Sequence, residues 1–150
     1  IHECDPVDEI IAGFGGQPGN SVESWRPLER WDEPDLAGGT RPLFRAWCPD
    51  PVAGMDNAYA AAAAMFMPID ALVWPAAMQA AGRLDGGPSL FTPTVEITAR
   101  FADTAHRTSW HLGESVVDHM STKSVAGTVR VWSADGVHGA TGHSLNLMIG

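Results

Sequence analysis

One short stretch of this chain combines side chains that could carry acid–base chemistry. Thr94, Glu96 and Thr98 lie two residues apart, and this spacing places them on one face of a β-strand. A carboxylate beside a hydroxyl could supply a base and a hydrogen-bonding partner for a reacting water. A polar face turned toward solvent explains the same alternation equally well, so both interpretations remain open.

Three further polar residues lie near the ends of the longest helical segment. Asp56 and Asn57 stand at its expected start, where they could act chemically but where helix capping is the more frequent role. Asp70 follows Pro68 and could turn toward a site, although a solvated aspartate in a turn is the simpler interpretation.

The six histidines do not form a recognisable metal site. His106 and His111 are five residues apart, as are His138 and His143, so neither pair shares the face of a strand. The chain has no His-Glu-x-x-His motif and no cysteine–histidine cluster. A zinc site is therefore not expected, and we expect the protein to work without a cofactor.

Three glycine-containing segments resemble known motifs only in part. Residues 13–19 lack the lysine and threonine of a phosphate-binding loop. Neither 113–115 nor 142–146 completes the Gly-x-Ser-x-Gly turn of a serine hydrolase. These segments argue against nucleotide binding and against a serine nucleophile.

The charge balance excludes several kinds of partner. Asp and Glu number 18 against 9 Lys and Arg, the formal charge is −9, and Lys123 is the only lysine. A nucleic-acid-binding surface needs a basic patch, so nucleic acid is not an expected partner. No apolar run approaches the roughly 20 residues that span a membrane.

The length and the two cysteines favour one domain in a reducing compartment. With 150 residues the chain suits a single domain, which we place at 21–150 after an N-terminal extension over 1–20 that includes a helical turn at 7–14. Cys4 and Cys48 do not imply a disulfide framework, and no signal peptide is visible, so a cytoplasmic location is expected.

The first half of the domain predicts two strands and one long helix. Strands are expected over 22–26 and 41–48, and a helix over the alanine-rich segment 55–67. Pro68 should kink or end that helix, and Pro75 should limit any continuation. Its alanines predict close packing, and its larger apolar side chains predict burial: Met55, Tyr59, Met65, Phe66 and Met67.

The second half follows a period of two, which is typical of strands. One strand is expected to turn Val95, Ile97, Ala99 and Phe101 to one face. Asp135-Gly136 is a hairpin signal. The expected strands cover 94–101, 110–119, 125–131 and 137–149. Strands, one long helix and then four antiparallel strands define an α+β class. A curved antiparallel sheet wrapped around one central helix, the hot-dog fold, satisfies these patterns.

Several segments also resemble the C-terminal hot-dog half of the acyl-CoA thioesterase II family, and the resemblance covers about residues 22–149. The segments that carry it are Leu43-Phe44-Arg45-Ala46-Trp47, Thr94 through Phe101, Ser109-Trp110-His111-Leu112, Val131 through Gly136 and Ala140-Thr141. Members of that family often join two hot-dog halves in one chain. The resemblance thus implies pairing, either as a homodimer or with a second hot-dog domain.

The resemblance implies a reaction in which an Asp, a Ser or Thr and a Gln orient a water that attacks a thioester. The hydroxyl maps onto Thr94 and the amide position onto Ser144. The carboxylate position falls on Met65 or its neighbours Ala64 and Phe66, none of which can act as a base. Asp56 is the substitute that we consider for the missing base.

The ligand that the resemblance implies is an acyl-CoA or another acyl thioester of lipid metabolism. Expected contacts with it come from the helix and its ends: Asn57, Tyr59, Met65, Phe66, Met67 and Trp74. Arg41, Arg45 and Arg100 are candidates for the coenzyme A phosphates. Core packing is the competing role of the apolar members, and solvent exposure that of the arginines.

The sequence therefore leaves two functions open. The first is hydrolysis of an acyl-CoA thioester, which the resemblance and Thr94 favour. The second is a non-catalytic hot-dog subunit that binds an acyl ligand or a partner chain, which the residues at the mapped positions Met65 and Ser144 favour.

Overall fold

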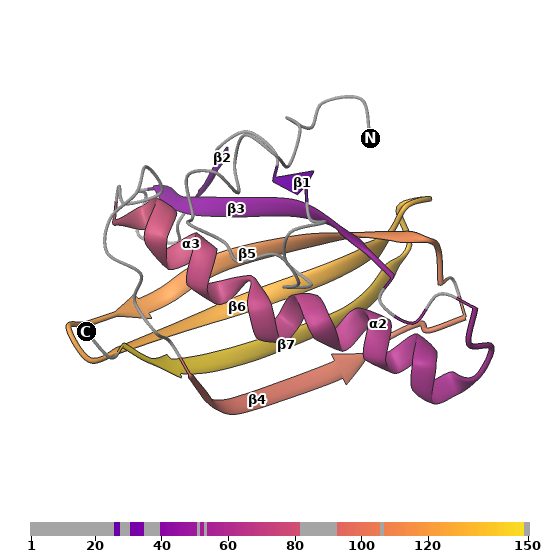
Figure 1. Cartoon of the computed structure of the whole chain (residues 1–150). Coiled ribbons are helices and arrows are strands. Elements are labelled where there is room, and N and C mark those ends of the chain that lie inside the picture. Colours follow the sequence, from indigo (N-terminus) through magenta and orange to yellow (C-terminus); the bar gives the residue numbers. More distant parts are fainter. Residues whose placement is uncertain are drawn as a thin grey trace.

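The structure is a computed structural model and describes residues 26–27, 31–34, 40–50, 52, 54–81, 93–105 and 107–148 (Figure 1). The helical turn expected at 7–14 lies outside these residues. So does most of the strand expected at 22–26, which overlaps the observed strand β1 (Arg26–Pro27) at a single residue.

The described strands form one antiparallel sheet. Five long strands follow the order β3-β5-β6-β7-β4, and the short strands β1 and β2 pair with β3. The strands are β2 (Trp31–Pro34), β3 (Thr40–Pro49), β4 (Thr94–Phe101), β5 (Trp110–Met120), β6 (Ser124–Ser133) and β7 (His138–Leu147). The strand predictions for the second half of the chain are confirmed. β4, although first of the last four strands in sequence, lies at the sheet edge beside β7.

The expected hairpin turn at Asp135-Gly136 is also confirmed. The amide of Ser133 donates to the carbonyl of Val137 over 2.9 Å, and that of Gly136 donates to Ser133 over 3.0 Å. Gly136 has a φ of +87°, a conformation that glycine adopts without the steric cost of a side chain.

The helical segment consists of α2 (Ala58–Ala71) and α3 (Val73–Ala80). Asn57 caps α2, because its side-chain oxygen accepts a hydrogen bond of 2.9 Å from the amide of Ala60. The sequence predicted that Pro68 would kink or end the helix; the helix does not end there, since α2 continues through Pro68 to Ala71. The break falls at Leu72 instead. A proline ring clashes with the carbonyl four residues earlier, and for Pro75 that carbonyl belongs to Ala71.

The two helices cross one face of the sheet (Figure 1), here called the helix side; the opposite face is the outer side. Four large side chains of the helical segment, one of them at the break between α2 and α3, are fully buried there, and each lies close to the position that a Cβ would take on a glycine of the sheet. The pairs are Met65 on Gly139, Ile69 on Gly142, Leu72 on Gly113 and Val73 on Gly127. Glycines thus let the helix approach the strands closely.

Burial along α2 is only partly as expected. Ala60, Ala64 and Met65 are buried, which confirms close packing of the alanine-rich face. Met55 and Tyr59, expected in the core, are 54% and 88% exposed, because they lie at the helix start on the side away from the sheet. By length and composition alone, the 23-residue segment Ala58–Ala80 could cross a membrane, but 61% of its most apolar window is buried inside the molecule, as in a core helix.

Candidate functional site

A chain of four hydrogen-bonded polar side chains lies where the end of α2 meets the start of β4. Thr94 Oγ1 donates to Asp70 Oδ1 over 2.8 Å, and Asn146 Nδ2 donates to Thr94 Oγ1 over 2.9 Å. Ser144 Oγ in turn donates to Asn146 Oδ1 over 2.9 Å. We call these residues the Asp70 network. Asp70 and Thr94 are half-buried, whereas Ser144 and Asn146 are only 2% exposed.

A β-bulge turns Thr94 toward this network. The pairing of β4 with β7 shifts between Thr94 and Glu96, so Thr94 pairs with Asn146 while Glu96 pairs with Leu145. The extra residue reverses the alternation of side chains. The prediction that Thr94 and Glu96 share a face is therefore wrong: Thr94 lies on the helix side, and exposed Glu96 lies on the outer side with Leu145.

The carboxylate comes from Asp70 and not from the positions to which the resemblance pointed. Met65 and Ala64 are buried in the core, and Phe66 is half-buried. Asp70 lies in the last turn of α2 and accepts the Thr94 hydroxyl, so it is not the solvated turn aspartate that the sequence suggested. The carboxylate that contacts Thr94 thus lies five residues after Met65, in the part of α2 that follows Pro68.

The amide comes from Asn146, although the resemblance pointed to Ser144. Both side chains point to the helix side, since alternate residues of β7 share a face. The Asn146 amide donates to Thr94 through its nitrogen and accepts a hydrogen bond from Ser144 through its oxygen. The sequence could have indicated Asn146, because it lies two residues after Ser144 in the same expected strand and therefore on the same face of the sheet.

The other predicted ligand-binding residues are spread along the helices. Asp56, Asn57 and Tyr59 lie at the start of α2; the thirteen residues from Asn57 to Asp70 correspond to about 20 Å along a helix. They are therefore not brought together with Thr94. Trp74, near the start of α3, is half-buried.

The three candidate arginines do not converge either. Arg45 on β3 bonds Glu114 of β5, with its Nε 2.8 Å from Oε1. Arg100 lies exposed on β4, and the side chain of Arg41 is outside the described part of the structure.

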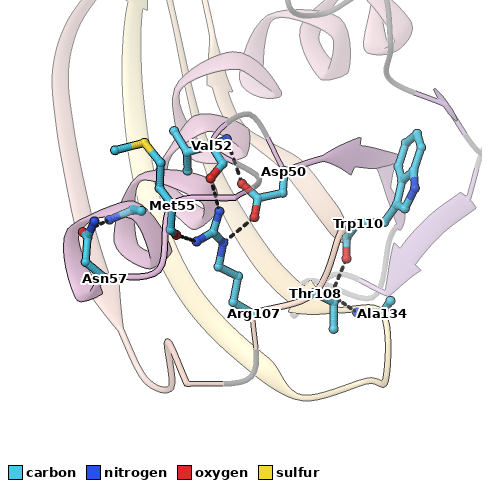
Figure 2. Close-up of polar contacts among 9 residues, drawn as sticks. Asp50, Val52, Met55, Asn57, Arg107, Thr108, Trp110 and Ala134 are labelled. Atoms are coloured by element: carbon cyan, nitrogen blue, oxygen red, sulfur yellow. Dashed lines mark hydrogen bonds and ion pairs between the residues drawn. The ribbon is translucent and has the colours of Figure 1, made fainter.

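A second polar cluster, which the sequence did not indicate, holds the loop before α2 (Figure 2). The guanidinium of Arg107 donates to the carboxylate of Asp50 and to the carbonyl oxygens of Val52 and Met55. The hydrogen bond to Asp50 raises the pKa of Arg107. This cluster fixes the loop that leads to the Asn57 cap and contains no side chain of the Asp70 network.

Next to this cluster, two titratable side chains are fully enclosed. Burial lowers the pKa of His111, Asp50 opposes this effect and Arg107 adds to it. His111 is therefore neutral at pH 7, and neither ring nitrogen has a hydrogen-bond partner in the described part of the chain. Burial raises the pKa of the Cys48 thiol, so this free cysteine is not a thiolate nucleophile.

No protein-family model and no curated protein matches this chain. Solved structures do. Zebrafish thioesterase superfamily member 2 is 12% identical and superposes with a TM-score of 0.61 over 98% of this chain and 99% of its own. A hypothetical thioesterase protein from Streptococcus pneumoniae, solved with coenzyme A, is 11% identical with a TM-score of 0.55 over 96% and 94%. The chain has the hot-dog fold.

Another hot-dog neighbour has a bound acyl ligand. The protein smu.793 from Streptococcus mutans, solved with acetyl-CoA, is 12% identical and gives a TM-score of 0.52 over 72% of this chain and 82% of its own. These likenesses confirm the fold expected from the sequence. Within this hot-dog fold, the Asp70 network joins the central helix to the edge strand β4 and to β7.

Proposed function

We propose that the protein hydrolyses an acyl thioester, of the acyl-CoA class, at the Asp70 network. The hydrogen bond from Thr94 to Asp70 carries this proposal. This hydrogen bond joins the carboxylate of Asp70 to the hydroxyl of Thr94 in a half-buried position at the sheet edge. The Asn146 amide donates to the same hydroxyl oxygen. A carboxylate, a hydroxyl and an amide are the three groups that the sequence resemblance requires, and here asparagine supplies the amide in place of glutamine.

The hydrogen bonds define what Asp70 can do. Oδ1 accepts the Thr94 hydroxyl, so Oδ2 is left to accept a hydrogen bond from a water. The carboxylate removes a proton from that water as its oxygen bonds to the thioester carbonyl carbon. The tetrahedral intermediate then breaks its carbon–sulfur bond. The proton passes to the leaving thiolate, and a carboxylic acid and a thiol are released.

The fold neighbours support the substrate class. Two of them were solved with coenzyme A or acetyl-CoA bound, and others are described as thioesterases. The packing of the core supports a particular location for the acyl group. Met65, Ile69 and Leu72 fill the space between helix and sheet, so the acyl chain lies along the surface that includes Asp70.

A second candidate function is acyl-ligand binding without catalysis, and one observation favours it. Both ends of the Asn146 amide are engaged within the protein, the oxygen by Ser144 and the nitrogen by Thr94. An amide in this state has less capacity to hold a water. The protein would then bind acyl-CoA and leave the thioester intact.

The experiment that separates the two measures thiol release from acyl-CoA substrates of several chain lengths, with binding measured by calorimetry. We expect turnover by the unmodified protein, and Asp70→Asn should lower kcat/KM by about 10²–10⁴-fold, as for loss of a general base. Thr94→Val should lower it by about tenfold through loss of one hydrogen bond to a charged group.

Matched changes outside the network serve as controls. Asp118→Asn and Thr122→Val alter exposed positions on β5 and in the turn after it, and should leave kcat/KM unchanged. Binding without any thiol release would support the non-catalytic function. Loss of turnover in Asp56→Asn with retention in Asp70→Asn would overturn the assignment of the base.

A further inference from the structure

Serine side chains are enclosed at three places in the described part of the molecule. Ser115, Ser133 and Ser144 are each at most 2% exposed. A hydroxyl that leaves water for a protein interior costs free energy unless it regains a hydrogen bond there. The partner of each hydroxyl therefore shows what the serine contributes.

Two of these serines make no hydrogen bond with the Asp70 network. The Ser115 hydroxyl, on β5, has no hydrogen-bond partner in the described part of the chain. The Ser133 hydroxyl lies at the hairpin between β6 and β7, where it accepts from the amide of Val137 over 3.0 Å and donates to the carboxylate of Asp135. Ser115 thus occupies space in the interior, and Ser133 holds a turn.

Ser144 is joined to the Asp70 network. Its hydroxyl donates to Asn146 Oδ1 over 2.9 Å, and this is the one hydrogen bond of that hydroxyl in the described part of the chain. Its partners across the sheet, Ile97 of β4 and Gly127 of β6, have no polar side chain. Within these strands the proton of the Ser144 hydroxyl thus has one side-chain acceptor, the oxygen of Asn146.

The Asn146 amide has two orientations to choose from, because its oxygen and its NH2 group are nearly alike in size and shape. In the observed one, Nδ2 donates to the Thr94 hydroxyl over 2.9 Å, and that hydroxyl donates to Asp70. A turned-over amide would present its oxygen to Thr94 and its NH2 group to Ser144. The Thr94 proton would then have two acceptors, and the Ser144 proton would have none among these side chains. The Ser144 hydroxyl therefore stabilises the observed orientation.

We propose that Ser144 is a positioning residue for the Asp70 network. Its hydroxyl holds the Asn146 nitrogen toward Thr94, which directs the single Thr94 proton to Asp70 Oδ1 and leaves Oδ2 for the water. Ser144 is enclosed and bonds the end of the Asn146 amide that is turned away from Thr94, so it does not touch the substrate. Its effect on turnover rests on the proposed function, whereas the orientation of the amide does not.

Thiol release by the full chain with acyl-CoA substrates tests the effect on turnover. Ser144→Ala should lower kcat about two- to tenfold, as for the loss of one neutral hydrogen bond. It should leave KM unchanged, because the side chain is enclosed. Ser144→Thr keeps the hydroxyl and should restore most of kcat, and Ser144→Cys keeps a weaker donor and should give an intermediate value. If the added methyl group of Ser144→Thr lowers the urea midpoint, the order of kcat for Ser, Cys and Ala at this position decides instead.

Ser115→Ala and Ser133→Ala are matched controls, because each removes the same atom from an equally enclosed position. Ser115→Ala should leave kcat unchanged and should not lower the urea midpoint, since its hydroxyl has no partner in the described part of the chain. Ser133→Ala should lower the urea midpoint by weakening the hairpin and should leave the kcat of the folded protein unchanged. Equal kcat in Ser144→Ala and Ser115→Ala would overturn the positioning role, and so would an equal loss of kcat in all three variants.

Side-chain amide NMR reads the orientation of Asn146 directly and needs no turnover. In the unmodified protein the Nδ2 protons should show an NOE to the methyl group of Thr94, and Asn146→Asp identifies their signals by removing them. In Ser144→Ala we expect a further NOE from these protons to the methyl group introduced at position 144, which reports the turned-over amide. A single set of signals without that NOE would refute the role of Ser144. Absence of turnover in every sample, the unmodified protein included, would refute the proposed function and leave the NMR result to decide the positioning.

Discussion

At the scale of single residues, the direction of the hydrogen bonds in the Asp70 network follows from chemistry. The carboxylate of Asp70 can only accept, so the single hydroxyl proton of Thr94 points to it. The Thr94 oxygen must then accept from an N–H, which fixes the Asn146 amide with its nitrogen toward Thr94 and its oxygen toward Ser144. Each side chain thus orients the next, and the Asp70 carboxylate accepts the hydrogen bond at the end of the chain.

This order predicts that Asn146→Asp disables the network although it changes the shape of one side chain very little. The new carboxylate cannot donate to Thr94, and it competes with Asp70 for the same hydroxyl proton. We expect a loss of stability of about 1–3 kcal/mol, the cost of a buried group left without a partner, and a strong loss of turnover. Urea unfolding and thiol release measure the two effects.

A matched control exists at the other end of α2. Asn57→Asp makes the same chemical change at a helix cap, where aspartate and asparagine are nearly equivalent. It should leave both the unfolding free energy and the turnover close to the original values. If Asn146→Asp behaves like this control, the amide does not organise Asp70.

The sequence identified Thr94 in this network and missed how its neighbours reach it. A period of two in the pattern places Thr94 with Glu96, but a one-residue bulge leaves no trace in hydrophobic alternation. Asp70 was visible in the sequence as a polar residue after Pro68. Its hydrogen bond to Thr94 depends on the helix continuing through that proline, which burial of Pro68 against the sheet stabilises and which local propensity opposes.

At the scale of elements, the helix is held to the sheet by close approach over glycines. A Cβ on Gly142 would lie 2.5 Å from Cγ2 of Ile69 and 2.7 Å from the backbone oxygen of Thr98. One on Gly139 would also meet a near neighbour, the sulfur and terminal methyl of Met65. The sulfur and terminal methyl of Met65 can rotate away from such a Cβ, whereas the backbone oxygen of Thr98 in a paired strand cannot.

These contacts predict unequal costs for the same substitution. Gly142→Ala should destabilise the protein by about 1–3 kcal/mol or more, as overpacking against backbone does. Gly139→Ala should cost less, because Met65 can adopt another rotamer. Denaturant midpoints of the two variants give the comparison, and circular dichroism checks that each keeps its fold. Equal denaturant midpoints of the two variants would show that the helix is not in close contact with the sheet at Gly142.

The elements themselves were largely predictable, for a physical reason. The strands of the second half alternate because one side of the sheet is covered by the helix and the other is not, and this imposes a period of two. The same reasoning failed at the helix start. Met55 and Tyr59 are large and apolar, yet they are exposed on the described chain, and no periodicity within a single sequence distinguishes a core residue from one that another copy could cover.

At the scale of the whole molecule, mild acid has two opposing effects on stability. The formal charge of −9 at pH 7 implies net repulsion in the compact state, which decreases as carboxylates take up protons. The buried imidazole of His111 acts in the other direction. It lies among Cys48 and Ser133 on the neighbouring strands, close to Asp50 and Arg107, and is not exposed at all.

The pH dependence of His111 has a definite sign. Its pKa in the folded protein is lowered, chiefly by burial, below the ordinary value of 6.5 that applies to the unfolded chain. The unfolded chain therefore binds a proton first as the pH falls through 6.5. The stability that neutral His111 contributes is complete above that pH and declines below it, by up to about 1.4 kcal/mol per pH unit for one proton.

His111→Leu should remove this decline. Urea unfolding of the original and the variant between pH 7.5 and 5.5 isolates the effect, because that window lies above the ordinary titration range of carboxyl groups. The free energy of unfolding of His111→Leu, relative to the original, should rise as the pH falls. A constant difference for His111→Leu would mean that the imidazole takes up its proton equally in the folded and the unfolded chain, contrary to the effect expected from its burial.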